Sequence, residues 1–129
     1  MSFFTPIISG IEPCHKILET DSYLSFLEKK PIKAGHCLVL PKLETDFIFD
    51  LEEAELSGLM NMARQVARAI RDSIPCKKVA MAVLGLEVRH AHIHLVPVDS
   101  AAELNFTAAR LIFSEAEFED TARRIRAAL

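Results

Sequence analysis

The stretch Arg89-His-Ala-His-Ile-His-Leu-Val-Pro-Val98 alternates histidine with apolar residues. Alternation with period two, leading into β-branched residues, is typical of a β-strand. Successive side chains of a strand point to opposite faces, so we expect His90, His92 and His94 to share one face. The apolar residues between them can pack into a core on the other face. The predicted strand thus carries three of the five histidines of the chain on one side.

The composition is that of one globular domain, which we expect over residues 1–129. Half of the residues are hydrophobic, enough for a single core. A net charge of −3 argues against a nucleic-acid partner, because such proteins usually carry a basic excess. The three cysteines form no CxxC pair, which favours reduced thiols. No apolar run is long enough to cross a membrane, so we expect a cytoplasmic protein without a membrane partner.

The chain before residue 42 predicts a short helix and three strands. Apolar residues recur at helical spacing over residues 3–11, just before a proline. Strand-like runs follow at 16–19, 22–28 and 36–41. The connections between them are short, which favours an antiparallel meander.

A long helix is predicted after the meander. Apolar residues from Leu56 to Ile74 follow a 3.6-residue period. Asp50 and Glu53 resemble a capping box at its start, and Pro75 ends it. The apolar run 78–84 is predicted to be a central strand.

A terminal helix is predicted by a second capping box, Ser114 with Glu117. Taken together, the elements predict an α+β fold with about five antiparallel strands. One long helix packs on the sheet, and short or terminal helices lie at both ends of the chain.

Two kinds of chemistry fit three histidines on one face. The first is a metal site with His36 or Cys37 as further ligands, although the chain has no CxxC pair, HExxH motif or nearby carboxylate cluster. The second is nucleophilic catalysis by a neutral imidazole, whose reference pKa is about 6.5. A neighbour that holds one ring nitrogen leaves the other free to attack phosphorus. We predict the second, without a metal or cofactor, and keep the metal as an alternative.

The histidine stretch resembles the His-φ-His-φ-His-φ-φ motif of the histidine triad (HIT) family, where φ is apolar. Residues 35–42, Gly-His-Cys-Leu-Val-Leu-Pro-Lys, are similar to the family's Gly-His-x-Leu-Val-Ile-Pro-Lys segment. Residues 13–28 are similar to the N-terminal meander of the Hint branch, and residues 85–95 also resemble a bacterial HIT-like subgroup. The resemblance covers residues 3–98 and implies the HIT-like fold. The segment from Asp99 onward matches no part of the Hint pattern.

The resemblance also implies roles for individual residues. His92 corresponds to the nucleophile, which attacks an α-phosphate and forms a nucleotidyl-histidine intermediate. His94 would lie beside the phosphate, while His90 and His36 would orient the cluster. Glu28 matches the acidic residue that binds the ribose. The other implied nucleotide-binding positions are Phe3, Phe4, Ile7, Phe26 and Leu27 around the base, and Glu87 and Val88 near the phosphate.

The chain departs from the Hint pattern just before the triad. The usual Asn is absent, and Leu86 and Glu87 replace a Gln-Ser or Gln-Thr pair that contacts the phosphate. A carboxylate there repels a phosphodiester unless it is protonated or turned away. The resemblance nevertheless implies a homodimeric hydrolase or nucleotidyl transferase for purine nucleotide conjugates, and this is what we predict. The alternatives are a nucleotide-binding module with little turnover and a metal-dependent hydrolase.

Overall fold

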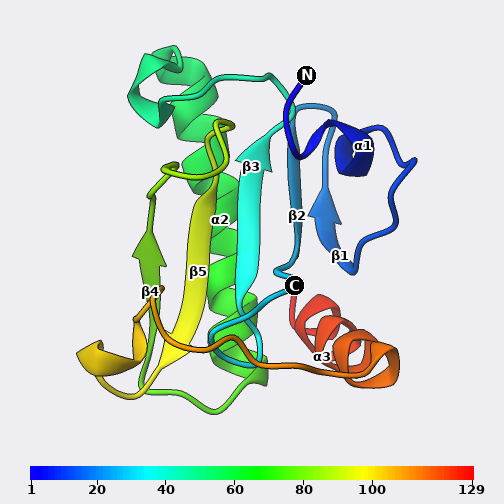
Figure 1. Ribbon diagram of the computed structural model, residues 1–129, viewed down its shortest axis with the longest axis vertical. Helices are drawn as coiled ribbons and strands as arrows, with labels where there is room; N and C mark the ends of the chain where they lie inside the picture. The colour runs from blue at the N-terminus through cyan, green and yellow to red at the C-terminus, as the bar shows by residue number, and fades with distance from the viewer.

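The computed structural model describes residues 1–129 and is organised around one antiparallel sheet (Figure 1). Its strands are β1 (Lys16–Glu19), β2 (Tyr23–Leu27), β3 (Cys37–Pro41), β4 (Lys78–Ala82) and β5 (Ile93–Val98), in the spatial order β1-β2-β3-β5-β4. The first three form the predicted meander. β5 then pairs with β3, with Leu38 beside His94. This pairing brings the start of β3 next to the histidine strand.

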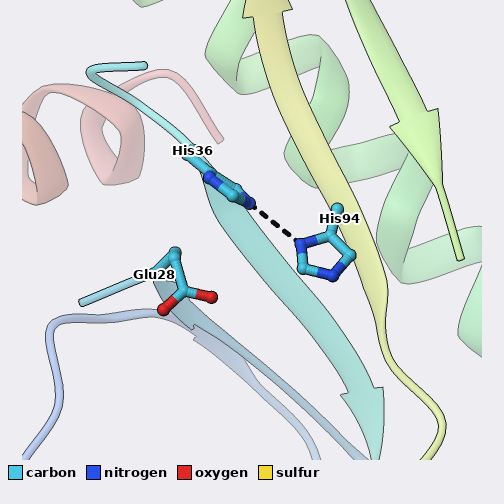
Figure 2. A group of neighbouring side chains, drawn as sticks. All are labelled: Glu28, His36 and His94. Carbon is cyan, nitrogen blue, oxygen red and sulfur yellow. Dashed lines mark hydrogen bonds between the residues drawn. The ribbon is translucent and has the colours of Figure 1, made fainter. Parts of the chain in front are cut away.

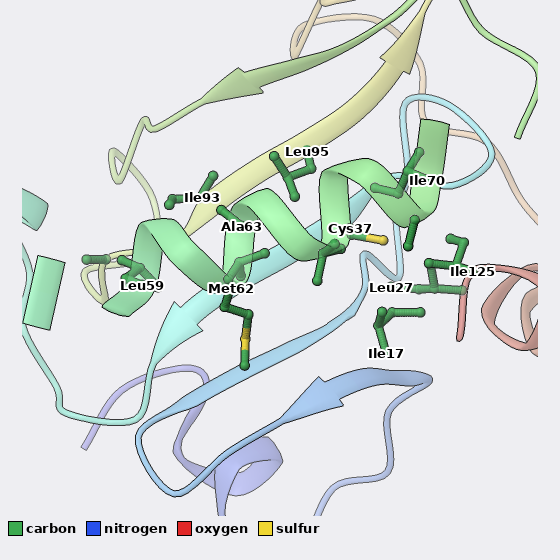
Figure 3. Close-up of a cluster of buried hydrophobic side chains, with 14 of the residues drawn as sticks. Ile17, Leu27, Cys37, Leu59, Met62, Ala63, Ile70, Ile93, Leu95 and Ile125 are labelled. Atoms are coloured by element: carbon green, nitrogen blue, oxygen red, sulfur yellow. The ribbon is translucent and has the colours of Figure 1, made fainter. Parts of the chain in front are cut away.

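One face of the sheet is covered by α2 (Glu53–Ser73) and α3 (Glu115–Ala127). In Figure 1, α2 runs behind β3 and β5. Alternate residues of the strands pack against apolar side chains of both helices, as Figure 3 shows. The central residues of this core are fully buried, among them Val39, Leu59, Val66 and Ile93. Burial of apolar surface on this scale is the main stabilising contribution to such a domain.

The opposite face carries the histidines and is covered only in part. The short helix α1 (Thr5–Ile8) packs over β2 and β3 through a small cluster that includes Phe4, Ile7 and Phe26. A second small cluster joins Val96 and Val98 to Phe106. Residue 106 belongs to the irregular segment that leads from β5 to α3 and crosses this face (orange in Figure 1). The histidines lie between these two coverings.

Gly35 allows the chain to enter β3 at the right place. Its φ of +94° is a conformation that side chains disfavour. A Cβ atom there would also lie 3.3 Å from both Ile74 and Pro97. The glycine therefore permits the close approach that places His36 at the head of β3.

Two details of the sequence prediction are wrong. The N-cap of α2 is Glu52, and no side chain caps this end of the helix. Asp50 lies in the 3₁₀ turn Ile48–Asp50, which separates it from the first helical amides. The strand β4 is not central, because β5 inserts between it and β3. The capping box of Ser114 and Glu117 is confirmed. None of the helices is both long and apolar enough for a membrane span.

Candidate functional site

The histidine motif is only partly a strand. β5 begins at Ile93, so His90 and His92 lie in the extended segment that leads into it. Their side chains still lie on the face away from α2, while Ala91, Ile93 and Leu95 pack into the core beneath that helix. The backbone amide of Ala91 donates to the carbonyl of Thr45 at 2.7 Å, which anchors the segment before the strand begins.

Hydrogen bonds to backbone carbonyls determine the tautomers of His90 and His92. A carbonyl oxygen only accepts, so a ring nitrogen beside one must carry the proton. His90 Nε2–H donates to the Pro41 carbonyl at 2.7 Å, which leaves Nδ1 to accept from the Ser2 hydroxyl at 2.7 Å. His92 Nδ1–H donates to the His90 carbonyl at 2.6 Å. In neutral His92 the Nε2 lone pair is therefore free.

A second chain of hydrogen bonds fixes His36 and His94. The Ile32 amide donates to His36 Nδ1 at 3.2 Å, so the proton of the neutral ring is on Nε2. That proton faces His94 Nδ1 at 3.0 Å (Figure 2). The proton of His94 is then on Nε2. This chain crosses from the loop before β3 to the start of β5.

Burial keeps these imidazoles neutral. Desolvation is the largest cause of the lowered pKa of His92. It also lowers the pKa of His94 to about 4, with further contributions from His92 and Arg110. The pKa of His36 falls to about 3 through burial, His94 and Arg110. At neutral pH the cluster therefore offers an unprotonated nitrogen, which is the form a nucleophile requires.

Aromatic rings enclose the histidines from both sides. The ring of Phe4 lies edge-on to His92 and His90, at centroid distances of 5.1 and 5.6 Å. On the other side the ring of Phe106 lies 4.8 Å from that of His94 and 6.2 Å from that of His36. These apolar edges exclude water and account for the desolvation.

The histidines border a cavity of about 280 Å³. His92 and His94 line it, as does the loop 84–88. Glu28, from the end of β2, lines the cavity as well, so the two acidic residues predicted to contact a nucleotide, Glu28 and Glu87, reach the same space. Val88 lines it too. The cavity therefore collects residues from four separate parts of the chain.

The apolar residues predicted to surround a base divide into three groups. Phe4, Ile7 and Phe26 are buried together on the histidine face. Phe3 is 66% exposed, and its ring contacts that of Phe4. Leu27 points to the opposite face, into the core beneath α2 and α3. It does not join the others, because neighbouring residues of a strand alternate in direction.

Three cavity residues come from the C-terminal segment and were missed by sequence reasoning: Phe106, Thr107 and Arg110. Ser2, the partner of His90, was missed as well. The segment 99–113 has no helical or strand periodicity, and its residues meet the histidines only through the tertiary fold. The one available signal was an arginine and an aromatic ring close together in an irregular stretch.

A metal ion fits this arrangement poorly. Glu28, His36 and His94 do bring three possible ligand atoms within 4.8 Å of one another (Figure 2). A zinc ligand must offer an unprotonated nitrogen. His36 uses its Nδ1 lone pair for the Ile32 amide and points its Nε2 proton at His94. A metal would have to replace both hydrogen bonds, so we derive no step through one.

Comparisons with known proteins agree with this fold. The profile of the HIT domain matches residues 9–101. The chain belongs to the HIT family. The uncharacterized HIT-like protein MT1300 of Mycobacterium tuberculosis is 29% identical over 98% of this chain and 91% of its own length.

Two further relatives extend the comparison. The adenosine 5'-monophosphoramidase HNT1 of Saccharomyces cerevisiae is 30% identical over 73% of this chain and 60% of its own length. A zinc-bound histidine triad family protein of Mycobacterium smegmatis superposes with a TM-score of 0.81, at 30% identity, over 97% of this chain and 90% of its own. The α+β architecture is thus the HIT fold, and a named hydrolase is among the relatives.

Proposed function

We propose that this protein is a nucleotide-binding hydrolase or nucleotidyl transferase that acts on the α-phosphate of nucleoside 5'-monophosphate derivatives. The observation that carries the proposal is the 2.6 Å hydrogen bond from His92 Nδ1 to the His90 carbonyl. It leaves Nε2 of neutral His92 unprotonated, and His92 lines a cavity together with further polar groups. An imidazole held in one tautomer by its second nitrogen is an activated nucleophile.

In the first step His92 Nε2 attacks the α-phosphorus. A nitrogen–phosphorus bond forms, and the bond from phosphorus to the leaving group breaks. The Nε2–H of His94 donates to a phosphoryl oxygen as negative charge develops on it. An acyl carboxylate or a phosphate leaves as an anion, whereas an amine takes a proton from water.

In the second step water attacks the nucleotidyl-histidine. The nitrogen–phosphorus bond breaks and the nucleoside monophosphate leaves. The lone pair returns to His92 Nε2, and one proton goes to solvent. Neutral imidazole leaves readily from the positively charged phosphoimidazolium, so the same nitrogen serves as nucleophile and as leaving atom.

Glu28 is the proposed ribose ligand. Its carboxylate borders the cavity and can accept from two hydroxyls. Phe4, Ile7 and Phe26 form the apolar cluster proposed to carry a purine, with Phe3 at its exposed end. Glu87 and Val88 line the same cavity and are the proposed neighbours of the phosphate or leaving group. Leu27 has no place in this arrangement, because it faces the other side of the sheet.

A homodimer is part of the proposal. The outer edge of β4 is free to pair, because this strand ends the sheet. Met81 on β4 is 52% exposed, and Val83 and Leu84 just beyond it are exposed too. Light scattering on the wild type and on Met81→Arg tests this, with a dimeric mass for the wild type only. A monomeric wild type contradicts it.

The activity is tested with an adenosine 5'-phosphoramidate. We expect the wild type to release AMP and His92→Ala to lose at least about 10³-fold in rate. His15→Ala is the matched control, because His15 stacks on Phe118, away from the cavity, and its rate should not change. Intact-mass measurement after rapid quenching should find an adenylyl group on the wild type alone.

Three outcomes contradict parts of the proposal. Hydrolysis by His92→Ala at the wild-type rate refutes the nucleophile. Activity lost on adding a chelator and restored by zinc indicates a metal-dependent hydrolase. AMP binding without turnover of any substrate indicates a binding module.

A further inference from the structure

Residues 99–113, here called the strap, cross the histidine face between β5 and α3 (Figure 1). The matched HIT domain ends at residue 101, so most of the strap lies outside it. The strap is held to the loop that follows β2. The Leu111 amide donates to the Pro31 carbonyl at 2.9 Å, and Lys33 pairs with Glu103 at 3.2 Å. These contacts fix the strap over one end of the cavity.

Arg110 projects from the strap into this cavity. One terminal nitrogen donates to the Lys30 carbonyl at 2.8 Å, and the other to the Phe106 carbonyl at 3.3 Å. The guanidinium carbon lies 5.9 Å from the centroid of the Phe106 ring. A guanidinium has five N–H donors in a rigid plane. Two bonds therefore orient the group and leave other donors for a ligand.

Without this arginine, the charges around the cavity would oppose the binding of a phosphate. The lining includes two carboxylates, Glu28 and Glu87, and two buried imidazoles that are neutral at pH 7. Arg110 is the one cationic side chain in that lining. A phosphate placed against His92 would meet repulsion from both carboxylates unless a cation offsets it. Guanidinium groups bind phosphate oxygens in pairs of charge-assisted hydrogen bonds.

We infer that Arg110 is the phosphate-binding residue of this chain and that the strap supplies it in place of the polar side chains missing at positions 86 and 87. The inference rests on the proposed function, since it concerns the phosphate that His92 would attack. It gives the strap a direct role in substrate recognition. It also implies that the chain binds nucleotides in preference to nucleosides, and that this preference depends on a residue outside the matched HIT domain.

The test compares the binding of AMP and adenosine by calorimetry. Arg110→Gln loses the charge but keeps an amide that can still donate to the Lys30 carbonyl, so the strap should stay in place. We expect AMP to bind about 10- to 100-fold more weakly to this variant, with adenosine affinity unchanged. Added salt should weaken AMP binding to the wild type more than to the variant. Arg123→Gln, which removes an exposed arginine from α3, is the matched control.

The outcomes separate this inference from the proposed function. Equal loss of AMP and adenosine affinity would mean that Arg110 only holds the strap, and would overturn the inference. Unchanged AMP affinity in Arg110→Gln would overturn it as well, while leaving His92 as the proposed nucleophile. A wild type that binds neither ligand would refute the proposed function and this inference with it.

Discussion

The cavity has two walls of different construction. The sheet wall consists of His92 and His94, both of them buried. The Nδ1 of His92 donates to the His90 carbonyl and the Nδ1 of His94 accepts from His36, so hydrogen bonds to His90 and His36 fix the two rings. The loop wall consists of residues 84–88 and the strap, where Leu86, Glu87 and Arg110 are exposed. In the sheet wall, protons are fixed by the fold. In the loop wall, few contacts hold the side chains, so we expect substitutions there to cost little stability.

This difference separates reactivity from recognition. A nucleophile needs a defined tautomer and a dry environment, and a sheet with aromatic cover supplies both. Recognition of a leaving group or phosphate needs charges that water can also reach. Leu86 and Glu87, which depart from the Hint pattern, lie on the loop wall. Substitutions there should change affinity, while substitutions in the sheet wall should change the rate.

After the loss of the nucleophile in His92→Ala, the largest effect is expected from His94→Ala. It removes the Nε2–H donor proposed for the phosphoryl oxygen, and the turnover rate should fall by about 10²- to 10³-fold. Affinity for AMP should change much less than the rate. Steady-state kinetics and calorimetry check the two separately. An unchanged rate would remove His94 from the mechanism.

The pH profile of kcat/KM probes the sheet wall next. Protonation would occupy the Nε2 lone pair of His92, and burial holds the pKa of this residue below its ordinary 6.5. We therefore expect a plateau at pH 7–8 and a tenfold loss per pH unit only below a midpoint that lies under 6.5. A midpoint above 7 would contradict the neutral nucleophile.

Stability should also depend on pH through His36. Its pKa is about 3 in the fold, compared with 6.5 when unfolded. Between these values the unfolded chain binds the proton and the folded chain does not, so the free energy of unfolding falls as pH is lowered below 6.5. Urea unfolding at pH 7.5 and 5 measures the loss. In His36→Asn, whose amide oxygen can accept from the Ile32 amide, the loss of unfolding free energy between pH 7.5 and 5 should be smaller. An equal loss in this variant would mean that another group causes the pH dependence.

A smaller change in rate is expected from Ser2→Ala. The variant deprives His90 Nδ1 of its 2.7 Å partner and loosens the residue whose carbonyl accepts from His92 Nδ1. One neutral hydrogen bond contributes about 1 kcal/mol, so we expect a loss of about fivefold in kcat. Ser9→Ala is the control, because Ser9 bonds only the nearby Pro6 carbonyl. Equal effects of the two would argue against an orienting role.

The smallest effect is expected from Glu87→Gln on the loop wall. Removing an exposed carboxylate beside the cavity should strengthen AMP binding by about two- to fivefold at low salt, and less at high salt. Glu52→Gln, an exposed carboxylate at the start of α2, should change nothing. Weaker AMP binding by Glu87→Gln would mean that this carboxylate contacts the ligand directly.

The sequence predicted the sheet and the long helix well because their periods of 2 and 3.6 are local. It missed the position of β4 at the edge of the sheet, because an apolar run of this kind fits a central strand and an edge strand equally well. It also misplaced the start of α2, since Asp50 and Glu53 have the right spacing but a 3₁₀ turn intervenes.

For the site, the motif placed the histidines in sequence but could not assign their protons. Those depend on Ile32, Pro41 and Ser2, which are distant in the chain or part of no motif. The strap was beyond prediction for the same reason. Arg110 reaches the cavity only because Pro31 and Lys33 hold the strap from another part of the fold.

The hydrogen-bond chain from Ile32 through His36 to His94 can run in one direction only. A backbone amide can donate but never accept, so neither histidine can exchange its tautomer without breaking the chain at its first link. The cavity is thus presented with a donor from His94, while the separate hydrogen bond to the His90 carbonyl leaves Nε2 of His92 as an acceptor. A ligand that offers an anionic oxygen beside an electron-poor centre satisfies both at once, whereas an amine or other cation satisfies only one. The Ile32 amide, away from the reacting atoms, thereby fixes the donor that His94 offers and so favours anionic ligands over cationic ones.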